Sequence, residues 1–393
     1  MLIAPMGVLR RILLTVFCIM LALSPALRAV EPFPTRLADD TFWDLVADSS
    51  EAGGDFLSEN FVSNELGYQY VIPPALEKIQ LGGVYLGVGP EQNFTYLAAF
   101  HPSVAFIVDI RRQNLIEHLL YKALFELSAD REEFVSRLFA RRLPPDPGHE
   151  PAANALFTTL AGVQQDPGFY RENLDAIKNV LLVQHHFGLS KEDETTLEHV
   201  YREFADRGAD TRYSVSNLAL IQRVQTSDVT TVITGPNSPG PLVFGTPFPS
   251  YSDLMKATDA SGKNWSYLAT EANYQVVREM QRKNLVVPLV GDFAGPKAIR
   301  AVGKYLRQHD STVSLFYISN VEQYLVPTPK LQSFYGNVAE LPLNSSGIFI
   351  RSIQGQGAQP GVAQSSISSI QKVMDAVLAG EAQNAYDIFR MTN

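Results

Sequence analysis

Two glycines and one aspartate occur at a spacing that suits nucleoside binding. Gly87 and Gly89 follow a short apolar run, and Asp109 follows a second apolar run, 20 residues beyond Gly89. Glycine permits a tight turn and lets a ligand approach the backbone closely. A carboxylate about 20 residues further on can accept hydrogen bonds from both hydroxyl groups of a ribose. The pattern therefore predicts a ligand site built from a glycine turn and an acidic side chain.

The elements around these residues must hold them at one edge of a sheet. Residues 84–86 and 104–108 are apolar runs that predict strands, and residues 91–100 predict a helix between them. Pro90 suits the start of this helix, because the first helical position needs no amide hydrogen. Strand, glycine turn, helix and strand together form one βαβ half of a doubly wound sheet.

A second unit of the same kind lies in the C-terminal half of the chain. Residues 285–290 and 312–319 predict strands, and residues 297–307 predict a helix between them. Asp292 and Asn320 follow these two strands. Ligands of open α/β sheets bind outside the carboxyl ends of the strands, so we expect both side chains on the rim that carries the glycine turn. Asp292 is the candidate general base at this rim.

These units predict an α/β fold with a doubly wound, mostly parallel sheet that is interrupted by a helical insertion. The expected divisions are a first Rossmann-like part at residues 30–145, the helical insertion at 146–208, a variable loop and strand region at 209–250, and a second Rossmann-like part with a C-terminal helix at 251–393.

Several segments carry a more local prediction. The polar run at residues 58–65 is typical of helix caps and turns, although it can also lie beside the ligand crevice. Residues 113–140 predict a helix whose apolar stripe leaves His118 and Lys122 facing away from the core. Residues 347–353 predict a late edge strand.

The region at 209–250 is harder to interpret. Residues 229–233 form a β-branched run that predicts a strand, and residues 236–249 are rich in Pro, Gly and Ser, which is typical of a long surface loop. Such a loop can act as a lid, but a tolerated insertion is the favoured interpretation.

The N-terminal segment predicts a secretory signal peptide. Arg10 and Arg11 precede a mostly apolar run at residues 12–23, and small residues then lead to Ala29. These three regions are typical of a signal that is cleaved, here near Ala29. We therefore expect an exported, periplasmic protein with no membrane span in its mature form. Cys18 is the only cysteine, so the mature chain has no disulfide.

Composition limits the classes of partner. The 393 residues are 46% hydrophobic and 19% charged, with a formal net charge of −9. No basic cluster is longer than two arginines, which argues against a nucleic-acid-binding surface. We expect a small-molecule ligand. His185, His186 and His199 resemble a metal cluster only weakly, because a zinc site needs three or four convergent ligands, and exposed histidines are the favoured interpretation.

The residues after the glycine turn bear on the identity of the ligand. A dinucleotide fingerprint has a third glycine where this chain has Gln92. Glu91 lies where a diphosphate would approach the helix N-terminus, so its charge disfavours NAD and favours the sulfonium of S-adenosylmethionine. Glu91 can equally be an acid that complements the helix dipole. Arg111 and Arg112 can bind a 2′-phosphate or be solvated.

Several segments of the chain resemble sequences of known protein families. Gly87-Val88-Gly89 with Asp109 resembles the first two motifs of class I S-adenosylmethionine-dependent methyltransferases. Longer segments resemble an uncharacterised bacterial family with a methyltransferase-like Rossmann domain, and these are LGVGPEQNFTY, VDIRRQN, LVGDFAGPKAIRAVGKYLR and FYISNVEQYL.

The resemblance implies an S-adenosylmethionine site lined by Gly87, Gly89 and Asp109. It also implies that Asp292 occupies the end of the fourth strand, which often faces the cofactor or the methyl acceptor. The complete set of expected cofactor-binding residues is Gly87, Gly89, Glu91, Asn93, Asp109 and Asn320. Two departures argue against methylation of base amino groups: Tyr85 replaces an acid, and no Asn/Asp-Pro-Pro-Tyr motif is present.

The leading hypothesis is an exported methyltransferase-like protein that binds S-adenosylmethionine or a related nucleoside and transfers methyl to a small or envelope-associated acceptor. Its difficulty is location, since S-adenosylmethionine is expected in the cytoplasm. The first alternative is a non-catalytic exported protein that uses a Rossmann crevice to bind a ligand. The second alternative is an oxidoreductase. Fold alone cannot choose among these three.

Overall fold

A computed structural model describes most of the chain. The described residues are 33–56, 58–144, 151–213, 222–225, 231–234, 242–244, 248–325, 329–353, 364–382, 387–388 and 390–391. The predicted signal peptide and its cleavage site lie outside them. Among the described residues, no helix is both long and apolar enough to cross a membrane.

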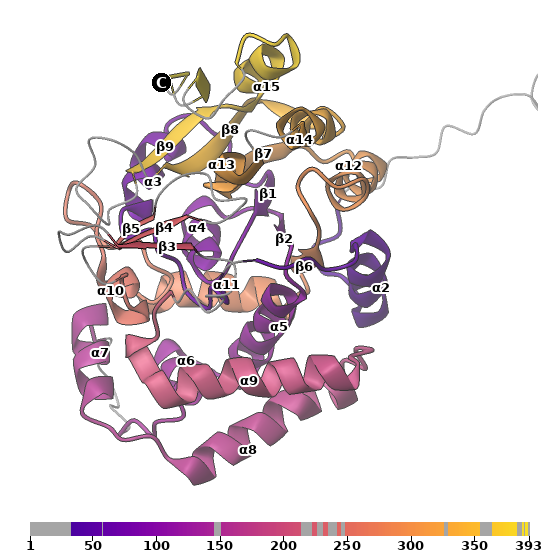
Figure 1. The fold of residues 1–393 in the computed structure, drawn as a ribbon. Coiled ribbons are helices and arrows are strands. Elements are labelled where there is room, and N and C mark those ends of the chain that lie inside the picture. Colours follow the sequence, from indigo (N-terminus) through magenta and orange to yellow (C-terminus); the bar gives the residue numbers. More distant parts are fainter. Residues whose placement is uncertain are drawn as a thin grey trace, which may run out of the picture.

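A six-stranded sheet forms the centre of the protein (Figure 1). Its strands are β1 (Val84–Gly87), β2 (Val104–Asp109), β6 (Val286–Val290), β7 (Val313–Ser319), β8 (Leu343–Ile353) and β9 (Gln364–Ser369). They lie in the order β6-β2-β1-β7-β8-β9, which in order of appearance along the chain is 3-2-1-4-5-6. Only the β8–β9 pair is antiparallel. The predicted α/β fold with a mostly parallel, doubly wound sheet is confirmed.

The parallel strands explain why the apolar runs were recognisable in the sequence. All residues of β1, β2 and β6 are buried, because helices cover both faces of a doubly wound sheet. Pro288 lies within β6 without interrupting it. It is tolerated because β6 is an edge strand whose one partner in the sheet is β2.

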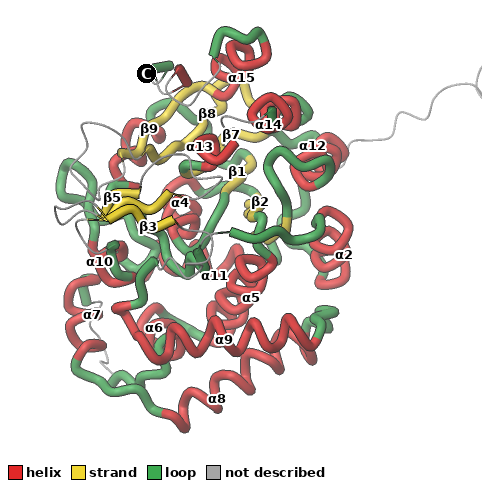
Figure 2. The backbone as a smooth tube through the Cα atoms, viewed as in Figure 1, coloured by secondary structure: helices red, strands yellow, loops and turns green. Residues whose placement is uncertain are grey.

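Two groups of helices cover the sheet (Figures 1 and 2). In one group, α11 (Glu271–Arg282) packs against α4 (Gln92–Phe100) and α5 (Arg112–Leu127). In the other, α12 (Ala298–Gln308) contacts α2 (Asp39–Ser49) and α14 (Lys330–Val338), and α14 contacts α15 (Ile370–Leu378). Figure 1 shows the two groups on opposite sides of the strands.

Helix α5 is buried on nearly every side, which corrects one prediction. His118 and Lys122 were expected to face away from the core, yet they are 2% and 1% exposed. The reason is tertiary, because α9 (Lys191–Arg207) and α11 pack on α5 in addition to the sheet. Lys122 Nζ is satisfied by Glu126, the carbonyl of Gln281 and Asn284.

Helices fill the predicted insertion and lie at one end of the molecule (Figure 1). Before it, α6 (Arg131–Leu138) follows α5. The insertion itself contains α7 (Ala153–Ala161), α8 (Pro167–Lys178), a π-helical turn (Asn179–Gln184) and α9. A capping box formed by Ser190 and Asp193 begins α9. Asp193 also pairs with Arg112 at the start of α5, so Arg112 joins the insertion to the sheet domain.

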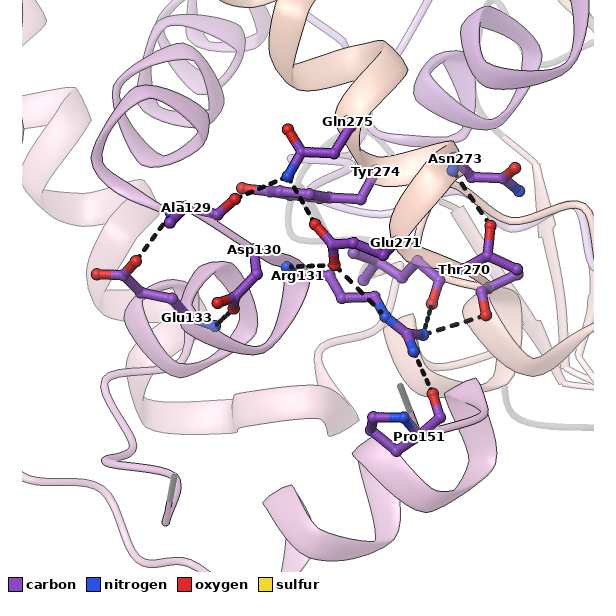
Figure 3. Close-up of polar contacts among 12 residues, drawn as sticks. Ala129, Asp130, Arg131, Glu133, Pro151, Thr270, Glu271, Asn273, Tyr274 and Gln275 are labelled. Atoms are coloured by element: carbon purple, nitrogen blue, oxygen red, sulfur yellow. Dashed lines mark hydrogen bonds and ion pairs between the residues drawn. The ribbon is translucent and has the colours of Figure 1, made fainter. Parts of the chain in front are cut away.

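Arg131 joins the start of α6 to two other segments (Figure 3). Its guanidinium donates to the carbonyls of Leu268 and Ala269 at 2.8 and 3.1 Å, and to that of Pro151. The side chain is 2% exposed. One buried cation therefore joins α6 both to the chain before α7 and to the segment before α11.

The two remaining strand predictions have different outcomes. The strand predicted at 347–353 is β8, but it lies inside the sheet, because the unpredicted strand β9 pairs beyond it. The strand predicted at 229–233 corresponds to β4 (Thr231–Thr234), which joins β3 (Gln222–Gln225) and β5 (Leu242–Phe244) in a separate antiparallel sheet. Much of the predicted loop at 236–249 lies outside the described residues.

The shorter elements complete the chain. They are two 3₁₀ turns (Tyr68–Val71 and Gly208–Asp210) and the helices α3 (Ile72–Leu76), α10 (Tyr251–Lys256) and α13 (Val321–Leu325). Of these, α13 follows β7 directly and so brings its residues to the carboxyl edge of the sheet.

Candidate functional site

A cavity of about 510 Å³ opens at the carboxyl ends of four adjacent strands. Each strand supplies a residue: Asp292 after β6, Asp109 at the end of β2, Gly89 after β1 and Asn320 after β7. The strand order reverses between β1 and β7, and such switch points are where open α/β sheets bind ligands. The cavity volume is in the range of small-molecule sites.

The predicted residues divide into two groups. Gly89, Asp109, Asp292 and Asn320 line the cavity, whereas the other three do not. Those three are Gly87, Glu91 and Asn93.

Asn93 stabilises the glycine turn from the protein interior. Its Nδ2 donates to the carbonyl oxygens of Val88, Gly89 and Pro90 at 3.0, 3.1 and 2.7 Å, and its Oδ1 accepts from the Tyr85 hydroxyl at 2.7 Å. The side chain is fully buried. Tyr85, which departs from the methyltransferase pattern, is therefore part of the support for the turn.

Both glycines are required by geometry. A Cβ at Gly87 would lie 2.1 Å from Asn93 Oδ1, so a larger residue would displace that support. Gly89 has a φ of 77°, in the left-handed region that favours glycine. Its carbonyl accepts a second hydrogen bond from His118 Nε2 at 2.9 Å. Burial lowers the pKa of His118 to about 4, so the ring is neutral at pH 7 and donates from Nε2.

Glu91 is directed into the protein. It is fully buried at the start of α4, and its Oε1 accepts a hydrogen bond from the amide of Ser63 at 3.4 Å. Burial, with a smaller contribution from the nearby Glu65, raises its pKa to about 8, although hydrogen bonds from backbone amides lower it in part. Because Glu91 does not line the cavity, its position provides no contact with a diphosphate or a sulfonium there.

Asp109 is bound by its neighbour Arg111. Asp109 Oδ1 accepts from the Arg111 amide and from Nε at 2.9 and 3.0 Å, and Oδ2 accepts from Nη2 at 3.0 Å. Both residues line the cavity. Each carboxylate oxygen can accept about two hydrogen bonds, so Oδ2 retains capacity for one ribose hydroxyl. Pairing with both hydroxyls would require Arg111 to move.

Asp292 follows β6, and this corrects its expected place in the fold. The resemblance implied the end of the fourth strand, but β6 is the third strand of the sheet, because the preceding β-branched segment belongs to the separate sheet. The fourth strand is β7, which ends at Ser319. Asp292 Oδ2 accepts from Lys330 Nζ at 2.8 Å, and Oδ1 accepts from the amide of Ala294. Its carboxylate is therefore already paired with a cation.

Residues from two stretches, 55–56 and 60–65, form one wall of the cavity. The wall includes Asn60, Ser63, Asn64 and Glu65. The polar run at residues 58–65 therefore lies beside the crevice, which was the second interpretation of this run. Glu65 is 2% exposed, and its Oε1 accepts a hydrogen bond from Ser319 Oγ. Sequence reasoning did not single out Glu65, because the segment precedes β1 and reaches the site through tertiary packing alone.

Aromatic side chains form much of the remaining surface, and the cavity lining includes Phe56, Tyr213, Phe293 and Tyr324. Phe56 meets Tyr324 edge to face, with ring centroids 5.2 Å apart. The Arg111 guanidinium lies over the Phe56 ring at 5.9 Å. Flat aromatic walls with polar groups between them suit a ligand that has a planar ring.

Helix α13 is anchored beneath the same wall. Its Glu322 forms a buried ion pair with Arg351 of β8, with Nε 2.6 Å from Oε2. Tyr335 also donates to Glu322. This cluster holds α13, and with it Tyr324, against the sheet.

The histidines singled out earlier have carboxylate neighbours. His185 lies 2.9 Å from Asp39 and 2.8 Å from Glu126, and His199 lies 2.9 Å from Glu59. Within the described part of the chain, no group of three or more His, Cys, Asp or Glu side chains is arranged to hold a metal ion.

The cavity residues fit most parts of an adenosyl ligand. Gly89 leaves its backbone accessible, Asp109 Oδ2 has an open acceptor position for a ribose hydroxyl, and the aromatic walls suit a base. Two further acceptors in the lining, Glu65 Oε2 and Gln92 Oε1, have no hydrogen-bond partner. These buried acceptors favour a ligand that carries donors or positive charge.

The sheet order and the cavity at its switch point define an α/β protein with a Rossmann-like sheet. The model of one protein family, described as a domain of unknown function (DUF7790), matches residues 60–143 and 191–383. The chain therefore belongs to this family. No curated protein matches the chain. The family description assigns no activity, so methyl transfer stays a prediction.

Proposed function

We propose that this protein binds S-adenosylmethionine or a related nucleoside in the switch-point cavity. One observation carries the proposal: Gly89 and Asp109, predicted from their spacing, line the same cavity at the ends of the adjacent strands β1 and β2. This is where a glycine turn and a ribose-binding carboxylate must meet. We also propose that residues 1–29 direct export of the protein.

The strand order sets the direction of the ligand. With the ribose at Asp109 on β2, the base extends toward Phe293 and Asp292 beside β6, and the 5′ substituent extends over Gly89 toward β7. Three strand spacings separate β6 from β7, about 14 Å in all. This span suits a nucleoside that carries an extended arm.

The proposed activity is methyl transfer to a small or envelope-associated acceptor. The cofactor would supply an electrophilic methyl group when bound. The protein would contribute orientation, since Asp109 holds the ribose and the aromatic walls exclude water around the arm. An oxygen or nitrogen acceptor would need a base, for which Asp292 was the sequence candidate.

A second candidate function is ligand binding without catalysis. The observation in its favour is the 2.8 Å ion pair between Asp292 and Lys330, because the carboxylate that would take the proton of the methyl acceptor already binds a cation. Asp292→Ala should abolish methyl transfer if Asp292 is the base and should spare ligand affinity if the protein only binds. An active Asp292→Ala variant would remove Asp292 as the base.

The proposal is tested by native mass spectrometry. The protein would be expressed from its full sequence, purified from the compartment it reaches, and titrated with S-adenosylmethionine. The key variant is Asp109→Asn, which keeps the shape of the side chain beside Arg111. A lost charge-assisted hydrogen bond should weaken binding roughly 10- to 100-fold.

Asp193→Asn is the matched control. Asp193 also pairs with an arginine, Arg112, but it does not line the cavity. Specific uptake by the wild type that Asp109→Asn reduces and Asp193→Asn retains would support the proposal. Well-folded wild-type protein that takes up no adenosyl compound would refute it.

A further inference from the structure

Among the acids that line the cavity, Glu65 differs from the others in its surroundings. Asp109 is paired with Arg111 and Asp292 with Lys330, and Asp55 is exposed at the rim. Glu65 is 2% exposed. No ion pair within the described part of the chain includes it. The inner part of the cavity therefore holds one acid that has no cationic partner.

The hydrogen bonds of Glu65 leave one of its carboxylate oxygens without a donor. Its Oε1 accepts from Ser319 Oγ, whereas Oε2 has no partner of suitable geometry. Burial raises the pKa of Glu65, and the nearby hydroxyls of Ser319, Tyr317 and Ser352 lower it in part. A buried acceptor without a donor is costly, so the site favours a ligand that supplies a donor or a positive charge.

The backbone conformation of Ser319 is an independent indication of a ligand site beside Glu65. Ser319 has a φ of 51°, a left-handed conformation that is uncommon for residues other than glycine. It ends β7 and directs its hydroxyl at Glu65. Strained residues of this kind cluster at ligand sites, where the surrounding structure holds them in place.

Glu65 lies on the side of the cavity where the arm of the ligand must end. Ser319 belongs to β7, which is two strands from Asp109 on β2, with β1 between them. This separation is about 10 Å. A group attached to the 5′ carbon of a ribose at Asp109 would pass over Gly89 and reach the Glu65–Ser319 pair.

We propose that Glu65, held by Ser319, binds the positively charged part of the arm that an adenosyl compound carries at its 5′ carbon. In S-adenosylmethionine that charge is the sulfonium or the α-ammonium. This inference rests on the proposed function and adds to it a ligand class, a nucleoside with a cationic 5′ substituent. It also assigns to Glu65 the preference for a positively charged ligand that the sequence predicted for Glu91.

The test measures binding, so it does not depend on turnover. Isothermal titration calorimetry would compare three probes: S-adenosylmethionine, S-adenosylhomocysteine, which lacks the sulfonium charge, and 5′-methylthioadenosine, which lacks the amino-acid group. Each would be titrated into the wild type and into Glu65→Gln, a variant that removes the charge and keeps the shape. Glu117→Gln is the matched control, because Glu117 is equally buried but does not line the cavity.

The affinity ratios identify the group that Glu65 contacts. We expect Glu65→Gln to weaken S-adenosylmethionine at least tenfold relative to 5′-methylthioadenosine. A loss for S-adenosylmethionine alone would assign Glu65 to the sulfonium, and an equal loss for S-adenosylhomocysteine would assign it to the α-ammonium. Glu117→Gln should keep the wild-type ratios. Ser319→Ala should shift the ratios in the same direction as Glu65→Gln, by a smaller factor, and it serves if Glu65→Gln does not fold.

Two results would overturn the inference, and they are distinguishable. In the first result, the wild type binds the probes, and Glu65→Gln (or Ser319→Ala in its place) keeps the wild-type affinity ratios. Glu65 then does not contact the positive charge of the ligand, and the proposed function is unaffected. If the wild type binds none of the three probes, the proposed function fails and this inference fails with it.

Discussion

Arg111 Nη2 lies 3.0 Å from Asp109 Oδ2, and each of the two side chains is 7% exposed. The carboxylate that the sequence assigns to the ribose is therefore already half of a buried ion pair. Arg111 also donates to the carbonyl of Glu59, which connects the pair to the cavity wall. Stability and the proposed ribose binding therefore depend on the same carboxylate.

Arg111→Met should destabilise the protein by about 3–5 kcal/mol, because it leaves a buried carboxylate without its partner. Unfolding in urea would measure the loss. Arg142→Met is the control, since Arg142 forms ion pairs at the surface, where such pairs contribute little. Adding Asp109→Asn to Arg111→Met should recover part of the loss. Equal stability of Arg111→Met and Arg142→Met would contradict the assignment of a buried pair.

Gly87→Ala should destabilise the protein by about 1–3 kcal/mol, because the new methyl group overlaps Asn93 Oδ1 and the Tyr85 ring. The matched substitution is Gly336→Ala in α14, where a Cβ meets nothing within 4 Å. Alanine in that helix should stabilise by about 0.5–1 kcal/mol. The two substitutions should therefore change the free energy of unfolding in opposite directions. An unchanged free energy of unfolding in Gly87→Ala would show that the turn tolerates a side chain.

His118 should make stability fall in acid. Its folded pKa of about 4 is below the value near 6.5 of an unfolded chain, so the unfolded state binds the extra proton as pH falls from 6.5 to 4. The loss should approach about 3 kcal/mol at the lower end of this window. His118→Gln can still donate to Gly89 and should lose this part of the pH dependence.

Urea unfolding at pH 5 and pH 7 would measure the effect of His118. His101→Asn is the control, because His101 is an exposed histidine at the end of α4 and its left-handed backbone suits asparagine. If His118→Gln retains the full acid dependence, His118 is not the group that titrates.

Glu91 should have the opposite effect. Its folded pKa of about 8 lies above the unfolded value near 4.3, so the folded state holds the proton more tightly. Its contribution to stability is present in acid and is lost as pH rises from 4.3 to 8. Glu91→Gln mimics the protonated acid, and at pH 9 it should be more stable than the wild type by about 3–5 kcal/mol. At pH 4.5 the two proteins should unfold at similar urea concentrations, and no gain at pH 9 would show that Glu91 is ionised without cost.

The strands and turns at the carboxyl edge of the sheet were predictable because each is indicated by a short stretch of sequence. The apolar runs at 84–86, 104–108 and 285–290 have lengths typical of buried strands, and the glycine turn lies directly between a strand and a helix. Four of the seven predicted site residues line the cavity because parallel strands bring their carboxyl ends to one edge. The other three support the site or lie behind it, since each faces the interior side of the turn.

The failures of prediction concern residues whose surroundings come from distant segments. His118 and Lys122 carry polar groups on a helix whose own sequence pattern is amphipathic, but packing by α9 and α11 buries both. Residues 347–353 were assigned to an edge because β9 contains little apolar signal, with four serines in six residues.

Sequence patterns alone predict the local units of this protein, which are the βαβ units, the glycine turn and Asp109 at the end of its strand. Each of these units is specified by residues that lie close together in the sequence. The order of the strands, the ion pair of Asp292 with Lys330 and the hydrogen bond of Ser319 to Glu65 become visible only in the folded protein. These depend on which distant segments share a surface, and that is set by packing of the whole core.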